Sequence, residues 1–314
     1  MDQSQNSGEC EPTRVMLWSI PRSLSTVVTK CISFIDGMEV WFEPYFICQE
    51  NLRVRNPDYL PDNPKMASYR QTLADFYSKL DSSTGTLGPR DNLYDEEKFT
   101  YLWVKSQLEK SRSKYILVKE MCHAIDGIPL TEYLPDVPFQ ETFLIRHPKK
   151  VFASFKRGGN IELGRNASDI DDTDIIHDLP VYHPDRFYKE LYEKWQTVKN
   201  TTGRLPVVIE ADDLLANPEL ILRKYFESVG FPWDKTLLSW DPSPEVSTRW
   251  HSSYMYMKTA SQSVWLKNAV SSSCFLPQDK TKKDTQSEEK LSRDIEICVN
   301  ASMPYYNEIR QHCI

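Results

Sequence analysis

The chain has 314 residues, of which 40% are hydrophobic and 26% are charged, and its formal net charge at pH 7 is −7. These values are typical of a globular protein with a sizeable core, and the acidic balance argues against a broad nucleic-acid-binding surface. The polar first residues lack the apolar core of a signal peptide, and no apolar run reaches the length of a membrane span, so we expect no membrane partner.

Short apolar segments and amphipathic segments alternate along the chain. The segments predicted as strands are 14–19, 39–42, 115–119, 139–145 and 205–210. The segments predicted as helices are 25–35, 67–80, 186–199 and 217–229. This alternation indicates an α/β fold, which we expect to form three layers, with a mainly parallel central sheet flanked by helices.

The other segments are less regular. Residues 1–12 predict a disordered tail, and residues 13–314 predict a single domain. Residues 157–186 contain many acidic residues and little periodicity, which predicts a long loop or lid. Residues 287–314 predict a C-terminal helical region, in which a helix over roughly 287–302 is expected to be stopped by Pro304.

The stretch SIPRSLST, residues 19–26, joins the first predicted strand to the first predicted helix. Unpaired backbone amides and the helix dipole at such a junction bind anions, and Arg22 adds a guanidinium suited to phosphate or sulfate oxygens. Ser23, Ser25 and Thr26 add hydroxyl donors. The GxxxxGK[ST] pattern of ATP-binding loops is absent, which argues against a kinase. Alternatively, a hydroxyl only caps the helix and Arg22 is solvated.

A second junction has the sequence FLIRHPKKVFASFKR, residues 143–157. It places Arg146 at a strand end and Ser154 one turn into a helix, so both can point at one anion. An arginine fork with a hydroxyl is a suitable clamp for a phosphate group. Two such sites at the carboxyl ends of strands would suit a nucleotide with two separate phosphate groups.

These two junctions and the block VVIEADDLLANPELILRKYFESVGFPWD, residues 207–234, resemble the sulfotransferases that use 3'-phosphoadenosine 5'-phosphosulfate (PAPS). The resemblance covers roughly residues 14–235 in order and spacing. It implies a P-loop nucleotide-binding type of fold and transfer of a sulfuryl group from PAPS to a hydroxyl or amine of a small-molecule acceptor. It also implies that Arg146 and Ser154 bind the 3'-phosphate.

The same resemblance implies that Arg22, Ser23, Leu24, Ser25 and Thr26 surround the 5'-phosphosulfate. Leu24 stands where these enzymes more commonly have glycine. Because leucine tolerates a positive φ poorly, we expect the loop to have ordinary helical φ at this position.

The acceptor must lose a proton during the transfer, so the reaction needs a base. Glu43 follows the second predicted strand. In carbohydrate, protein-tyrosine and several bacterial sulfotransferases a glutamate at about this distance after the loop is the base, so the resemblance makes Glu43 the first choice. The small-molecule cytosolic branch uses a histidine from a stretch like VKTHLP. Here the comparable stretch is LVKEMCHAI, in which Met121 stands at the position of that histidine and His123 follows two residues later. His123 is therefore an alternative base. Lys119 matches the lysine of that stretch and, with Arg22, would stabilise the transferring sulfonate.

Other features leave alternatives open. The RKG element of the cytosolic branch is absent, and the stretch 247–265 could form the late loop over the nucleotide or acceptor. Trp18 and Trp250 could stack on adenine or belong to the core. A nucleotide-binding protein without transfer activity and another P-loop enzyme are the competing interpretations. The oligomeric state is not indicated.

The spacings of the cysteines and histidines indicate the cellular compartment of the protein and whether it has a metal-binding site. Seven cysteines lie scattered without a CxxC pair, which fits reduced thiols in a cytoplasmic protein. The six histidines are isolated, so no metal site is expected.

Overall fold

The computed structural model describes residues 11–55, 98–125, 127–179, 181–253, 256–257, 260–275 and 291–314. The predicted helix over residues 67–80 lies outside these residues. So do most of the predicted N-terminal tail and the first residues of the predicted C-terminal helix.

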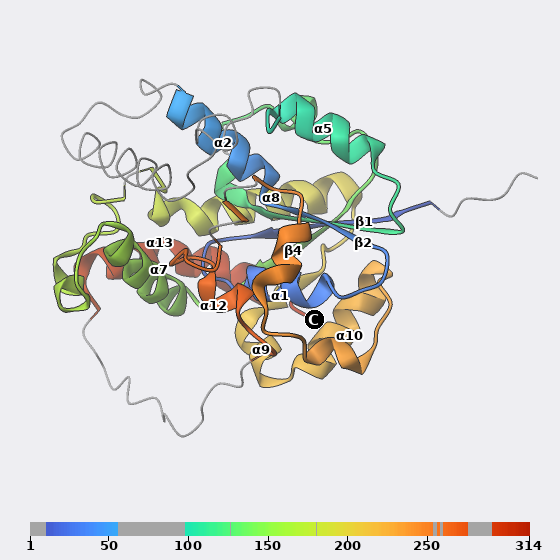
Figure 1. Ribbon diagram of the computed structural model, residues 1–314. Helices are drawn as coiled ribbons and strands as arrows, with labels where there is room; N and C mark the ends of the chain where they lie inside the picture. Colours follow the sequence, from blue (N-terminus) through green and yellow to red (C-terminus); the bar gives the residue numbers. More distant parts are fainter. Residues whose placement is uncertain are drawn as a thin grey trace, which may run out of the picture.

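Five parallel strands form the central sheet of the described chain, in the order β2-β3-β1-β4-β5 (Figure 1). The strands are β1 (Thr13–Ser19), β2 (Met38–Phe42), β3 (Tyr115–Met121), β4 (Gln140–Ile145) and β5 (Val208–Glu210). All five predicted strands are therefore confirmed. Because β1 lies in the middle, the loop that follows it is at the centre of the carboxyl edge of the sheet.

Helices cover both faces of this sheet, which gives the expected three layers (Figure 1). One face carries α2 (Pro44–Arg55), α5 (Tyr101–Lys110), α7 (Pro148–Glu162), α8 (Phe187–Thr202) and α13 (Arg293–Arg310). The other face carries α1 (Ser25–Ile32), α9 (Ala211–Ala216), α10 (Pro218–Val229) and α12 (Lys267–Val270). A short helix, α6 (Leu130–Tyr133), precedes β4.

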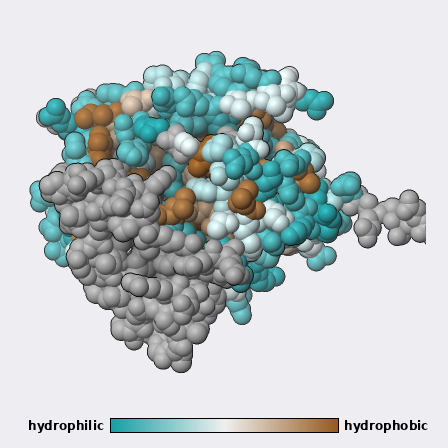
Figure 2. Space-filling model, turned by 90° about the horizontal axis from the view of Figure 1, so that it is seen from above, coloured by the Kyte–Doolittle hydropathy of each residue, from teal (hydrophilic) through white to brown (hydrophobic). Residues whose placement is uncertain are grey.

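The core is divided by the sheet as strand geometry requires. Successive side chains of a strand point to opposite faces, so Met16 and Trp18 pack with α7 and α8, whereas Val15 and Leu17 pack with α1 and α10. Seen from above, much of the described surface is hydrophilic (Figure 2). Among the described helices, none combines the length and apolar character that a membrane crossing requires.

The predicted loop over residues 157–186 is only partly a loop, which corrects the sequence prediction. Residues 157–162 continue α7, and Gly158 in this turn lets Trp265 approach the helix, since a Cβ atom there would lie 2.4 Å from the indole ring. Farther along, Ile175 and Leu179 are fully buried, and Leu179 packs against Gly159. The segment is therefore attached to the core at several points.

The prediction that Pro304 stops the last helix is wrong. Pro304 lies inside α13, which continues to Arg310. A proline inside a helix costs about 3 kcal/mol because it removes one backbone hydrogen bond and crowds the preceding turn. The apolar face of α13 continues past the proline, and the buried side chains of Cys298, Tyr306 and Ile309 keep both halves packed on the core.

Lys30 on α1 fastens this helix to the chain on both sides of Trp265. Its ammonium donates to the carbonyls of Ser243 (3.2 Å), Val270 (2.5 Å) and Ser272 (2.8 Å), and the side chain is 0% exposed.

We expect Lys30→Met to lower the free energy of unfolding by roughly 3 kcal/mol, because it leaves three carbonyls without their donor. Urea unfolding would measure this loss, with Lys224→Met on the exposed face of α10 as the matched control. Equal stability of the two variants would contradict the clamping role.

Candidate active site

The carboxyl ends of four neighbouring strands bring most of the predicted site residues to one edge of the sheet. Glu43 follows β2, Lys119 lies near the end of β3, the loop with Arg22 follows β1, and Arg146 follows β4. The register supports this order, since Leu17 of β1 pairs with Lys119. The sequence positions are far apart, and the parallel sheet places them side by side.

The loop between β1 and α1 has a conformation that differs from the prediction. Leu24 has a φ of 74° and Arg22 a φ of 65°, so both lie in the left-handed region. The expectation of ordinary helical φ at Leu24 is therefore wrong. The left-handed turn directs the Leu24 carbonyl to the amides of Val27 and Val28, at 3.0 and 3.1 Å, and so starts α1. A leucine in this region costs about 1–2 kcal/mol, which the surrounding structure must offset.

The three predicted hydroxyl donors of the loop differ in their availability. Ser23 is fully buried and donates to the Ile20 carbonyl at 2.8 Å, so its hydroxyl closes the loop. The hydroxyls of Ser25 and Thr26 make no hydrogen bond within the part of the chain that is described. The first turn of α1 therefore offers hydroxyls and amides to an anion.

Arg22 connects the two predicted anion sites. Its Nε donates to Ser154 Oγ at 2.9 Å, and its Nη1 donates to the Trp265 carbonyl at 2.8 Å. Arg146 Nη1 donates to the Arg22 carbonyl at 2.9 Å. Burial, followed by the charges of Arg146 and Arg157, lowers the pKa of Arg22 to about 10. Cations gathered at one place attract an anion, so the two predicted sites form one continuous basic cluster.

Arg146 retains a donor that is suited to a ligand. Its Nε is buried and has no hydrogen-bond partner among the described residues. The Tyr188 hydroxyl donates to the Arg146 carbonyl, which fixes the backbone at this point. A buried guanidinium N–H without a partner is unfavourable, and a phosphate oxygen would satisfy it.

Glu43 and Lys119 form a buried pair beside the loop. The Lys119 ammonium donates to Glu43 Oε1, and each of the two residues is 1% exposed. The ammonium also lies 4.9 Å from the centre of the Phe42 ring. The Glu43 backbone has a φ of 54°, and no peptide bond among the described residues, including the one to Pro44, is cis. The carboxylate thus has the nearby cation that an ionised base requires.

Tyr256 completes this pair, and the sequence analysis missed it. Its hydroxyl donates to Glu43 Oε2 at 2.6 Å. Burial, followed by the charge of Glu43, raises the pKa of Tyr256 well above its usual value, so the phenol stays protonated. Tyr256 belongs to the aromatic stretch that follows Arg249, but no pattern in that stretch distinguishes it from its neighbours.

Glu120 is the second residue that was missed, a carboxylate adjacent to Lys119 in β3. It is 0% exposed and accepts hydrogen bonds from the amides of Tyr45 (2.6 Å), Phe46 (3.3 Å) and Met121 (2.7 Å). It therefore caps the first turn of α2, which begins directly after Glu43. Burial raises the pKa of Glu120 to about 8, against the opposing effect of the Met121 amide.

This raised pKa predicts a pH dependence of stability. The folded protein holds a proton on Glu120 that the unfolded chain releases near pH 4.5, so its contribution to stability is present at low pH. That contribution is lost as the pH rises towards about 8. We expect Glu120→Gln to remove up to about 4 kcal/mol of this pH-dependent loss. Urea unfolding at several pH values would measure it, and parallel profiles for the two proteins would contradict it.

The alternative base and the first candidate adenine platform are buried in the core. His123 is buried among the rings of Phe46, Tyr182 and Phe187, with centroids 5.3–6.4 Å away. Trp18 is fully buried, so its ring has no free face for adenine.

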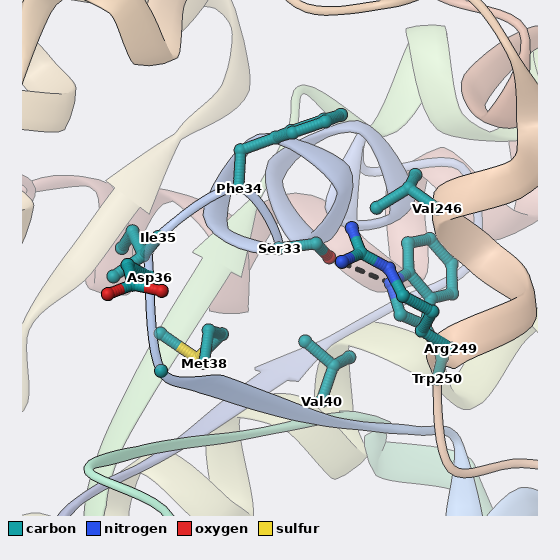
Figure 3. Close-up of a pocket in the computed structure, with 10 residues that line it drawn as sticks. Ser33, Phe34, Ile35, Asp36, Met38, Val40, Val246, Arg249 and Trp250 are labelled. Atoms are coloured by element: carbon teal, nitrogen blue, oxygen red, sulfur yellow. Dashed lines mark hydrogen bonds between the residues drawn. The ribbon is translucent and has the colours of Figure 1, made fainter.

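Trp250 lines a pocket of about 290 Å³ at the opposite edge of the sheet (Figure 3). The pocket lies by the end of α1 and the first residues of β2, and the Trp250 indole donates to Ser33 Oγ at 2.7 Å. Arg249, also from the predicted late loop, lies on the same pocket. The Trp250 ring also stacks on the Phe42 ring, with the two centroids 4.8 Å apart, so Trp250 packs beside β2.

Comparison with solved structures identifies the fold. The sulfotransferase domain of the Synechococcus PCC 7002 olefin synthase superposes with a TM-score of 0.52 and 13% identity, over 97% of this chain and 98% of that domain. The sulfotransferase domain of the curacin biosynthetic pathway superposes with a TM-score of 0.51 and 14% identity, over 96% of this chain and 99% of that domain. The chain has a sulfotransferase fold. No protein-family profile and no curated protein sequence matches it significantly. The expectation for the α/β architecture is thus confirmed at the level of the fold.

Proposed function

We propose that the protein is a PAPS-dependent sulfotransferase that acts on a hydroxyl or amine of a small molecule. The observation that carries this proposal is the basic cluster of Arg22, Arg146 and Arg157 with Ser154, at the carboxyl end of the central strand. Guanidinium groups gathered beside a helix N-terminus suit a ligand with several phosphate or sulfate groups.

The residues of this cluster fit the two ends of PAPS. Arg22 and the first turn of α1, with Ser25 and Thr26, would hold the 5'-phosphosulfate. Arg146, through its unpartnered Nε, and Ser154 would hold the 3'-phosphate. When bound, PAPS supplies the sulfonate group that is transferred and leaves 3',5'-ADP.

Glu43 and Lys119 have the chemical properties that the transfer requires. Glu43 accepts the proton that the acceptor hydroxyl or amine loses, and the Lys119 ammonium is in contact with this carboxylate. In this proposal, Lys119 and Arg22 stabilise the negative charge that develops on the leaving oxygen. Glu43 is preferred to His123 as the base because it is paired with Lys119.

The cellular setting is part of the same proposal. The described cysteines, at positions 31, 48, 122, 274, 298 and 313, are free thiols, which is consistent with a reducing cytoplasm. No group of three or more His, Cys, Asp or Glu side chains with metal-binding geometry gathers among the described residues. The expectation that no metal takes part stays a prediction.

Ligand-dependent stabilisation tests the proposal at the level of binding. We expect 3',5'-ADP to raise the melting temperature, whereas ATP, which lacks a 3'-phosphate, should have a much smaller effect. Incubation with PAPS and a set of hydroxylated and amino compounds should release 3',5'-ADP and form a sulfated product. Stabilisation by 3',5'-ADP without any release would favour a binding protein without transfer activity. Stabilisation by ATP alone would reject the proposal.

A further inference from the structure

Glu43 has no free oxygen in this structure. Lys119 occupies Oε1, the Tyr256 hydroxyl occupies Oε2 at 2.6 Å, and the carboxylate is 1% exposed. A general base must form a hydrogen bond with the group whose proton it removes. Each carboxylate oxygen can accept a second hydrogen bond, but at 1% exposure an acceptor has no access to Glu43. If Glu43 is the base of the proposed function, one of its two partners must therefore give way to the acceptor.

The two partners differ in how easily they can leave. Lys119 lies within β3, is 1% exposed, and its charge would remain buried without a partner if the contact broke. Tyr256 contributes a neutral hydroxyl from outside the central sheet, and a neutral donor costs far less to move. The acceptor therefore replaces Tyr256.

The ring of Tyr256 packs against two other aromatic rings, as an aromatic ligand in a binding site would. It lies 6.2 Å from the Phe42 ring at an interplanar angle of 30°, and 6.3 Å from the Phe46 ring. Phe42 directly precedes Glu43 and Phe46 lies in the first turn of the helix that follows it, so the chain places this aromatic surface beside the base. A phenol ring packed on two aromatic side chains, with its hydroxyl on a carboxylate, is the arrangement expected for an aromatic acceptor.

We propose that the Tyr256 side chain occupies the acceptor position on Glu43 and is displaced when the acceptor binds. The proposal rests on the proposed function for the role of Glu43. Tyr256 is then a built-in competitor that keeps water away from the base until an acceptor replaces it.

Removal of the Tyr256 side chain should create a site for its own fragment. Para-cresol has the ring and hydroxyl of tyrosine, and an apolar space left by a truncated side chain can bind an aromatic molecule. We expect Tyr256→Ala to bind para-cresol at least about tenfold more tightly than the wild type, in which the tyrosine competes. Calorimetry and the shift of the melting temperature would measure this without nucleotide. Toluene, which lacks the hydroxyl, should bind more weakly than para-cresol.

With PAPS present, Tyr256→Ala should also sulfate para-cresol faster than the wild type does. The phenolic oxygen forms a bond to sulfur, the bond from sulfur to the bridging phosphate oxygen breaks, and the phenolic proton goes to Glu43. Mass spectrometry of the sulfated product would measure the rate.

Tyr256→Phe is the matched variant. It keeps the ring, so para-cresol binding should stay at the wild-type level. It removes the hydroxyl from Glu43, so release of 3',5'-ADP from PAPS without an acceptor should rise as water reaches the base. An unchanged or lower release would overturn the proposal, even if Tyr256→Ala failed to fold.

A folded Tyr256→Ala that binds para-cresol no better than the wild type would also overturn it. Tyr182→Ala serves as a control for nonspecific filling of a space, and equal binding of para-cresol to this variant would count against the proposal. The binding assay needs no nucleotide. Failure of every variant to bind 3',5'-ADP would therefore reject the proposed function separately, while para-cresol binding would still decide the position of Tyr256.

Discussion

Arg22→Ala is expected to weaken the binding of 3',5'-ADP by at least about 100-fold, because it removes a charge-assisted fork from the centre of the basic cluster. Arg146→Ala should have a similar effect through the loss of its buried Nε donor. Isothermal titration calorimetry would measure both losses. The fold should persist, since Arg22 is only partly buried and lies in a loop.

Arg249→Ala is the matched control for these two variants. Arg249 is exposed and lies on the pocket at the opposite edge of the sheet, so its charge should not affect nucleotide binding (Figure 3). If Arg22→Ala and Arg146→Ala bound 3',5'-ADP as tightly as Arg249→Ala, the basic cluster would not be the nucleotide site.

Glu43→Gln is expected to retain nucleotide binding and to lower the turnover of PAPS by roughly 100-fold to 10,000-fold, the range for loss of a positioned general base. Glutamine keeps the shape of the side chain and offers Lys119 an oxygen, but it cannot take a proton. It leaves the buried Lys119 charge without its counter-charge, so a lower melting temperature is also expected. The assay therefore belongs at a temperature at which the variant remains folded.

His123→Asn distinguishes the two candidate bases. If Glu43 is the base, this variant should retain most of its turnover, because His123 packs among aromatic rings. A large loss of turnover in His123→Asn, together with nearly normal turnover in Glu43→Gln, would reverse the assignment. The dependence of turnover on pH in each variant would support the distinction.

Local sequence patterns were enough to predict the architecture. Each strand is a short apolar run between turn residues or charges, and burial on both faces of the sheet requires such runs. The regular apolar faces of α8 and α10 were recognised for the same reason. The errors fell where packing overrode a local preference. Pro304 remains inside α13, and Leu24 adopts a left-handed conformation.

The site residues that the sequence predicted and those that it did not reveal differ in whether a local pattern marks them. Arg22, Arg146 and Ser154 stand at junctions between a strand and a helix, where a local pattern marks a site for an anion. Tyr256 lies 213 positions from the carboxylate that it contacts, and Glu120 lies 75 positions from the Tyr45 amide. No local pattern encodes such contacts.

The sequence alone thus determined the five strands along the chain, the α/β class and the junctions that carry the basic residues, but it did not reveal helices α2 and α5. These features depend on the periodicity of apolar residues and on local backbone chemistry. Only the tertiary structure decided that Arg22 contacts Ser154, that Glu43 is paired with Lys119 and Tyr256, and that Trp250 stacks on Phe42. These contacts depend on the order of strands in the sheet, which brings distant parts of the chain to the same edge.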